Sequence, residues 1–296
     1  MDRDSLYFGY GSNLDAPDLE RWCKTEGAPF PLGRSLGSAR IPDMELCFDY
    51  ESSRRKAGAL DLRPCIGQVV EGQLFEVNDG GWEVLDLKEG VPSNCYERSA
   101  MHVIRDAGEL VEAITYTVLP RHRREFVAPN ADYIKVVRGG LRAFGLAVDQ
   151  FEAASRDQPV PLVVDALFVY GTLMRGGPNF DVLTGGGELG CVLPAAMRGR
   201  MVDLGRYPAV INEGRGRVHG EFVRVRDLAG TLCRLDQLEG FHGYDAKSLY
   251  HRVIARVDIG RSQSRDAWTY VLANSRRNHP VVASGNWRKY QTRQVI

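Results

Sequence analysis

The stretch that decides the fold stands near the start of the chain and reads Leu6-Tyr7-Phe8-Gly9-Tyr10-Gly11-Ser12-Asn13-Leu14. A second stretch echoes it in the other half, as Leu167-Phe168-Val169-Tyr170-Gly171-Thr172-Leu173. Both are short apolar runs that end in Tyr-Gly-Ser or Tyr-Gly-Thr. That pattern is typical of a buried strand that enters a tight glycine turn. Its recurrence indicates a duplicated domain.

Further elements follow each glycine turn in the same order. The segment from Gly67, GQVVEGQLFEVNDGGWEVLDLKEGV, matches the segment from Gly216, GRVHGEFVRVRDLAGTLCRLDQLEGF. Each predicts a strand, a turn and a short helix-like stretch, which ends in Glu-Gly at Glu89 or Glu239. A Tyr-x-Arg follows each glutamate, at 96–98 and 250–252. We therefore interpret the chain as two copies of one small domain.

The two copies join around residues 147–164. The stretch SRDQPVP at 155–161 reads as a linker, and we predict domains at 1–152 and 163–296. Alternating, strand-like segments fill most of each half, while helical spacing is rarer and is clearest from Asn130 to Gly145. We expect an α+β fold of two tandem small mixed β-barrels with peripheral helices.

Composition narrows the class of ligand. The 296 residues carry a formal net charge of +0, so nothing favours nucleic acid or an anionic membrane as a partner. The N-terminus lacks an apolar run of signal-peptide length, and the six scattered cysteines include no CxxC pair. We expect a reduced, cytoplasmic protein that binds a small molecule; the oligomeric state stays open.

The glycine turns and the glutamates are the residues that can carry chemistry. Successive amides in such a turn form a concave site for a carboxylate or a developing oxyanion, although a tight turn alone also explains the glycines. A carboxylate at the C-terminal end of a helix is disfavoured by the helix dipole. With partial burial, its pKa rises toward the range of a general base; a solvated surface acid is the alternative.

These considerations give a set of candidate residues. The candidate catalytic groups are Glu89 and Glu239. The histidines are not paired across the repeat, and no shared metal-ligand constellation is present, so we expect no metal. The candidate substrate-binding residues are Tyr10, Gly11, Ser12, Asn13, Leu14, Tyr96, Tyr170, Gly171, Thr172, Leu173 and Tyr250.

At these residues the sequence resembles the γ-glutamylcyclotransferase-like superfamily. The first half is similar to γ-glutamylcyclotransferase itself, through the motif at 10–14, Glu89-Gly90-Val91 and Tyr96. The second half is similar to the γ-glutamylamine cyclotransferase and AIG2-like branch, through the motif at 169–173, Glu239-Gly240 and Ser284-Gly285-Asn286-Trp287.

The resemblance implies an amine-releasing acyltransferase or lyase that needs no cofactor. In a γ-glutamyl amino acid, peptide or amine, the α-amino group attacks the γ-carbonyl, 5-oxoproline closes, and a glutamate serves as general acid/base. One alternative is biosynthetic removal of a γ-glutamyl protecting group from a specialised metabolite. Another is a non-catalytic carboxylate-binding module.

The two halves depart from each other at two places. The stretch from Glu239 to Tyr250 is longer than that from Glu89 to Tyr96, so Tyr244 is a rival for the role of Tyr250. Leu173 also stands where the first half has an asparagine. We therefore expect different pockets with different substrates, or one domain that turns over while the other binds.

Overall fold

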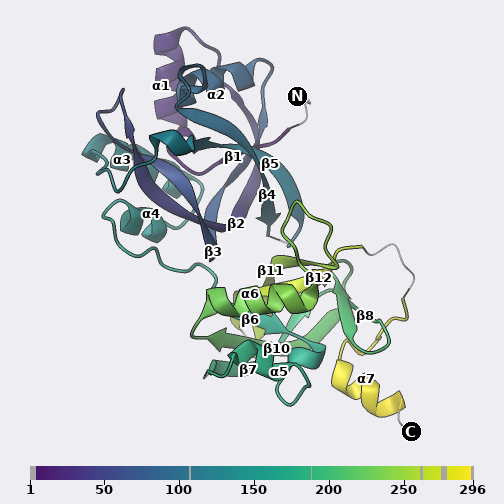
Figure 1. Ribbon diagram of the computed structural model, residues 1–296. Coiled ribbons are helices and arrows are strands. Elements are labelled where there is room, and N and C mark those ends of the chain that lie inside the picture. The colour runs from purple at the N-terminus through teal and green to yellow at the C-terminus, as the bar shows by residue number, and fades with distance from the viewer. Residues whose placement is uncertain (1–4, 107, 188, 261–262, 275–278, 295–296) are drawn as a thin grey trace. The chain divides into compact units, whose positions relative to one another are not determined.

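Five strands close into a barrel in the first half of the chain (Figure 1). They are β1 (Tyr7–Gly9), β2 (Leu32–Ser52), β3 (Ala57–Val77), β4 (Tyr96–Arg105) and β5 (Leu110–Val118). Their order is β1-β3-β2-β4-β5, and a parallel pairing of β1 with β5 closes the ring. β1 is buried along its whole length, as its apolar run predicts. This computed structural model describes residues 5–106, 108–187, 189–260, 263–274 and 279–294.

The second half repeats this ring. Its strands are β6 (Ala166–Val169), β7 (Leu189–Arg198), β10 (Arg217–Val225), β11 (Tyr250–Ile259) and β12 (Gln263–Leu272). β6 pairs antiparallel with β10 and parallel with β12, just as β1 pairs with β3 and β5. The order β10-β6-β12-β11-β7 is the same ring with β6 in place of β1. The prediction of two small mixed barrels is confirmed.

The connection between the second and third strands of each ring differs. In the first barrel it is the far end of one long hairpin, because β2 and β3 each run for 21 residues. In the second barrel it is a separate two-stranded sheet of β8 (Arg200–Asp203) and β9 (Pro208–Ile211). The same step in the topology therefore places different residues beside each barrel.

Helices lie around each ring. In the first half they are α1 (Ala16–Glu26), α2 (Gly81–Glu89), α3 (Ala131–Ala143) and α4 (Asp149–Ala154). In the second half they are α5 (Phe180–Thr184), α6 (Leu228–Glu239) and α7 (Trp287–Gln294). α3 matches the predicted helix and begins where the Asn130 side chain accepts the amide of Tyr133. None of the helices in the described ranges is long and apolar enough to span a membrane.

Single-turn 3-10 helices complete the structure, and the glycine turns form two of them. These are η1 (Ser12–Leu14), η2 (Val91–Ser93), η3 (Pro120–His122) and η4 (Gly171–Leu173). η1 follows β1 directly, and η4 follows β6 in the same way.

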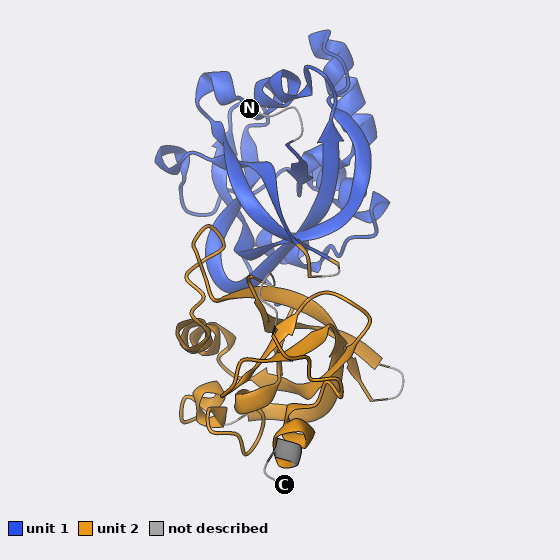
Figure 2. Cartoon of the chain, turned by 90° about the vertical axis from the view of Figure 1, so that its right-hand side faces the viewer, with its two compact units in different colours: residues 1–105, 110–163 blue, residues 106–109, 164–296 orange. Residues whose placement is uncertain are grey.

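The chain divides into two compact units (Figure 2). The first comprises residues 1–105 and 110–163, the second residues 106–109 and 164–296. α4 crosses residue 152, where we placed the end of the first domain, and its Phe151 is fully buried against Phe48 at 6.0 Å between ring centres. Each unit has its own apolar core.

Candidate active site

Both candidate glutamates end a helix, as the sequence predicts. α2 ends at Glu89 and α6 ends at Glu239, and the next residue in each case is a glycine with φ of 70° or 61°. That left-handed conformation suits glycine and stops the helix there. The carboxylates consequently stand at the C-terminal ends of their helices, where each lines a cavity of its own unit.

In the first unit, Glu89 lies between an outer cavity of about 510 Å³ and a small inner recess, and lines both. The Asn13 amide donates to the Glu89 carboxylate at 2.8 Å and to the Tyr7 hydroxyl at 2.9 Å. Burial raises the pKa of Glu89, while the charge of Lys88 and the Asn13 hydrogen bond act in the opposite direction. Lys88 and Asn13 thus both favour the ionised form of the base, and Asn13 does so through a direct hydrogen bond.

In the second unit, Glu239 lines a cavity of about 190 Å³. Leu173 is buried where the first unit has its asparagine, and no hydrogen bond to the Glu239 carboxylate occurs among the described residues. Burial alone raises the pKa of Glu239 to about 7. This carboxyl is therefore half protonated near neutral pH, the condition under which one group both accepts and returns a proton efficiently.

Four candidate tyrosines are fixed in matching ways. The hydroxyls of Tyr10 and Tyr170 donate to carbonyls on the last strand of their own barrel, at 2.8 Å and 2.6 Å. Tyr96 donates to the Leu60 carbonyl at 3.0 Å, and Tyr250 approaches the Pro208 carbonyl at 3.5 Å. Burial raises the pKa of all four hydroxyls, so they stay neutral. Their oxygen lone pairs remain available to a ligand.

Of the two tyrosines considered for the second pocket, Tyr250 lies at the cavity and Tyr244 does not. Tyr250 lines the second cavity despite the longer stretch after Glu239, whereas Tyr244 is not among the lining residues and packs on Phe241. The extra residues form turns between α6 and β11, and the Leu249 amide returns to the Gly240 carbonyl at 3.0 Å. The insertion therefore leaves the start of β11 in place.

The remaining candidate residues divide between pocket and core. Gly11, Ser12 and Asn13 line the inner recess of the first unit, and Thr172 and Leu173 line the second cavity. Leu14 is buried in the apolar core and lines neither cavity. Its side chain therefore does not reach either cavity, and its role in substrate binding stays a prediction. Gly171 instead packs on Pro208, where a Cβ atom would lie 2.4 Å from the proline ring.

Sequence reasoning missed an ion pair that holds each glutamate helix. Arg98 donates to both oxygens of Asp86, at 2.6 Å and 2.7 Å, and Arg252 lies 3.2 Å from Asp236. A tyrosine from the last barrel strand also donates to each aspartate. The sequence does contain a pattern that indicates these pairs, because both helices read Leu-Asp-x-x-Glu-Gly and both arginines belong to the repeated Tyr-x-Arg.

Tyr133, on α3, is a second missed residue. Its hydroxyl accepts the amide of Leu60 at 3.2 Å, and the residue lines both the outer cavity and the inner recess. Leu60 therefore binds one phenol through its N–H and another, Tyr96, through its carbonyl. α3 reaches the site through long-range packing, so no local pattern indicates this residue.

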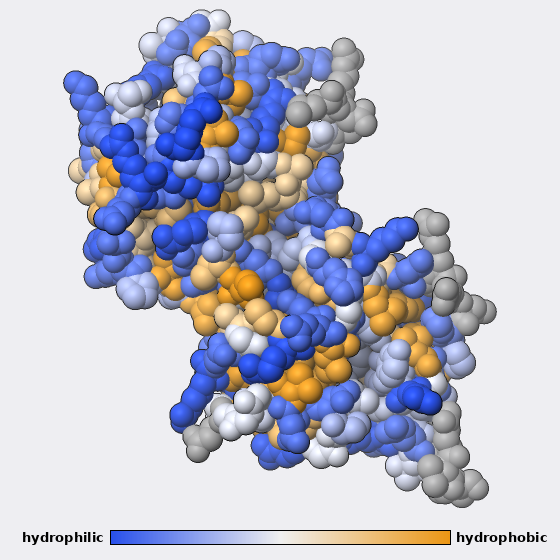
Figure 3. Space-filling view, viewed as in Figure 1, coloured by the Kyte–Doolittle hydropathy of each residue, from blue (hydrophilic) through white to orange (hydrophobic). Residues whose placement is uncertain are grey.

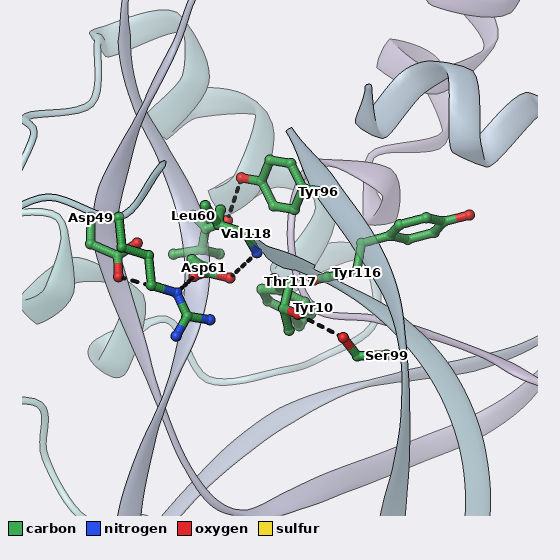
Figure 4. A network of polar contacts seen from close by, with 10 residues as sticks. Tyr10, Asp49, Leu60, Asp61, Tyr96, Ser99, Tyr116, Thr117 and Val118 are labelled. Atoms are coloured by element: carbon green, nitrogen blue, oxygen red, sulfur yellow. Dashed lines mark hydrogen bonds and ion pairs between the residues drawn. The ribbon is translucent and has the colours of Figure 1, made fainter. Parts of the chain in front are cut away.

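An acidic cluster lies just beyond Leu60 (Figure 4). The ligand atoms of Cys47, Asp49 and Asp61 lie within 4.8 Å of one another, a spacing that could hold a cation. The Arg123 guanidinium is the cation beside these carboxylates, at 3.2 Å from Asp61 and 3.9 Å from Asp49. Burial still raises the pKa of Asp61 to about 7.

Comparisons with known proteins identify similar chains for both halves. Residues 167–289 match the family described as "Gamma-glutamyl cyclotransferase, AIG2-like", and residues 69–151 match the "AIG2-like family". A protein of Vibrio cholerae serotype O1 named "Putative gamma-glutamylcyclotransferase" is 34% identical over 121 residues, which make up 41% of this chain and 93% of that protein.

Two solved structures are also similar to this chain. One, titled "Gamma-glutamyl cyclotransferase", is 23% identical, with 53% of this chain and 89% of that chain covered and a TM-score of 0.43. The other is YkqA from Bacillus subtilis, 21% identical, with 54% of this chain and 56% of that chain covered and a TM-score of 0.45.

Proposed function

Because this chain belongs to the γ-glutamylcyclotransferase-like superfamily and carries two tandem domains of it, we propose that both barrels convert γ-glutamyl compounds into 5-oxoproline and a free amine. Glu89 and Glu239 are the proposed general acid/base groups. The observation that carries the proposal is the repeated constellation around them. In each unit a half-buried glutamate ends a helix that an Asp–Arg pair holds, and it faces two anchored tyrosines.

The proposed reaction is an internal acyl transfer. The glutamate carboxylate takes a proton from the α-ammonium group of the substrate, and the freed amine attacks the γ-carbonyl carbon. A C–N bond closes the five-membered ring as the original γ-amide C–N bond breaks. Both protons that the α-nitrogen loses end on the departing nitrogen, one of them through the glutamate. No water is consumed, and positioning supplies much of the acceleration because the attack is intramolecular.

Neutral groups around the glutamate suit a substrate ammonium. In the first unit, the Asn13 side-chain oxygen is buried without a hydrogen-bond partner among the described residues, since only its N–H groups are engaged. The tyrosine oxygens beside it offer lone pairs. We assign the substrate carboxylate or the developing oxyanion to the glycine-turn amides, as their conformation suggests.

The site favours catalysis over simple carboxylate binding. Among the described residues that line the second cavity, Glu239 is the only one with an acidic carboxyl or a basic side chain. A module that merely captured a carboxylate would gain nothing from a second carboxylate there, since like charges repel. A base with a pKa of about 7 instead suits proton transfer near neutral pH.

The test is release of 5-oxoproline by the full chain, by three variants of the two glutamates and by one control variant. With a panel of γ-glutamyl amino acids, peptides and amines, E89Q and E239Q should each lose one part of the activity, and the double variant should lose about 10²–10⁴-fold. Glu83→Gln, an exposed acid on the same helix as Glu89, is the matched control and should retain full turnover. Wild-type protein that makes no 5-oxoproline from any compound would refute the proposal. A double variant that keeps wild-type turnover would remove both glutamates from the mechanism.

A further inference from the structure

The two cavities differ in the chemistry of their mouths, where we place the leaving group. The glutamate and two tyrosines are common to both cavities, and the turns differ beside the glutamate, at Asn13 and Leu173. We therefore assign the choice of leaving group to the residues farther out. Those residues come partly from the connection that differs between the rings, namely the β2–β3 hairpin end in the first unit and the β8–β9 sheet in the second.

The mouth of the first cavity is cationic. Apart from Glu89, its charged lining residues are one acid, Asp18, and four bases on α1, α2 and the hairpin end: Arg21, Arg54, Arg55 and Lys88. The surface around α1 and α2 is correspondingly mostly blue in Figure 3.

Two of these bases lack an acidic partner. Arg21 pairs with Asp18, and Arg54 pairs with Glu26. In the described part of the chain, no ion pair to a carboxylate is formed by Arg55 or Lys88. The Arg55 guanidinium lies over the Tyr133 ring, 4.4 Å from its centre, and so stands beside the proposed reaction site. Burial lowers the pKa of Lys88, and a bound anion would offset that burial.

The mouth of the second cavity is apolar. Tyr207, Leu238 and Leu249 line it and are 41%, 42% and 51% exposed. These three come from the β8–β9 turn, from α6 and from the residue before β11, so three separate segments converge on one apolar rim. Orange surface is visible around α6 in Figure 3. Exposed apolar side chains that gather in this way mark a binding surface for apolar groups.

We infer that the two barrels act on leaving groups of opposite character: the first releases an amine whose substituent carries carboxylates, the second an amine whose substituent is apolar and uncharged. The inference rests on the proposed function. A carboxylate at the second mouth would lose water without meeting a cation, and it would also face Glu239. At the first mouth it meets Arg55 and Lys88 and gains charge-assisted hydrogen bonds.

The experiment compares two substrates on two single-site enzymes. E239Q leaves only the first barrel active, and E89Q leaves only the second. γ-Glutamyl-glutamate has a leaving group with two carboxylates, while γ-glutamyl-phenethylamide releases an apolar amine. The ratio of kcat/KM for the two compounds should favour γ-glutamyl-glutamate in E239Q and the phenethylamide in E89Q, each by about tenfold or more.

Substitutions at the two cavity mouths then test which residues cause each substrate preference. Arg55→Gln in E239Q should lower the preference for γ-glutamyl-glutamate about tenfold, whereas Arg34→Gln, an exposed arginine outside both cavities, should not move it. Leu249→Lys in E89Q should lower the preference for the phenethylamide, with Leu193→Lys as its exposed control outside the cavity.

The possible outcomes of these kinetic comparisons separate failure of the inference from failure of the proposed function. The same preference in both single-site enzymes, or reversed preferences, would overturn the inference while leaving 5-oxoproline release intact. If E89Q alone is inactive on both compounds, the part that concerns the second barrel is overturned. If wild-type protein releases no 5-oxoproline from either compound or from the wider panel, the proposed function fails and the inference falls with it.

Discussion

The loss of second-barrel activity at low pH is the most direct measure of the pKa of the proposed base, Glu239. E89Q silences the first barrel, so the remaining 5-oxoproline release reports on Glu239. Burial raises the pKa of that carboxyl to about 7 from the usual 4.5, and only its ionised form accepts a proton. Activity should therefore fall as the pH drops through about 7, to roughly a tenth at pH 6 and roughly a hundredth at pH 5.

The assay is kcat/KM for γ-glutamyl-phenethylamide between pH 5 and 9, because kcat/KM reports the pKa values of the free enzyme. Far-UV circular dichroism at each pH serves as the control that the chain stays folded. A midpoint near about 4.3, where an exposed glutamate titrates, would refute the reasoning. It would mean either that Glu239 is solvated in the working enzyme or that another group is the base.

Three further outcomes are expected. Asn13→Leu in E239Q enzyme removes the N–H that favours ionised Glu89, so the pKa of Glu89 should rise. The loss of first-barrel activity at low pH should then begin at a higher pH. An unchanged pH profile would contradict the role of Asn13. E239Q should also stabilise the second unit at pH 8, by at most about 3 kcal/mol, since burial disfavours only the carboxylate. In urea unfolding that gain should shrink as the pH falls through about 7 and vanish below 4.5, where the wild-type carboxyl is protonated in both folded and unfolded chains. Asp86→Asn breaks the two-bonded pair with Arg98, which should cost about 2 kcal/mol of stability and lower kcat of the first barrel more than it raises KM. A raised KM with an unchanged kcat would assign the pair to substrate binding instead.

Local patterns in the sequence predicted the parts of the fold that depend on neighbouring residues. The apolar run before each glycine turn is a buried strand, and each Glu-Gly ends a helix because glycine alone readily adopts the left-handed conformation found there. The duplication was visible because both copies keep these elements in one order. It correctly implied that the two rings share one topology.

The parts that sequence reasoning missed depend on contacts between distant segments. The approach of Tyr133 to Leu60 joins residues 73 apart in sequence, and nothing within either segment indicates it. The difference between the mouths likewise follows in part from a hairpin end in one unit and a small separate sheet in the other. Leu14 is a further case, since the side chain of a residue inside the motif packs in the apolar core.

The backbone at Leu60 and Pro208 bears on how freely the two barrels can be interconverted. Each supplies the carbonyl that the tyrosine after the glutamate approaches, but only Leu60 has an amide proton, which it gives to Tyr133. Proline has no such proton. A phenol introduced beside Pro208 would therefore find no backbone N–H to accept. To gain that hydrogen bond, the proline would have to be replaced as well. Giving the second unit the phenol-to-backbone contact of the first therefore takes two substitutions, one that introduces the phenol and one that replaces Pro208.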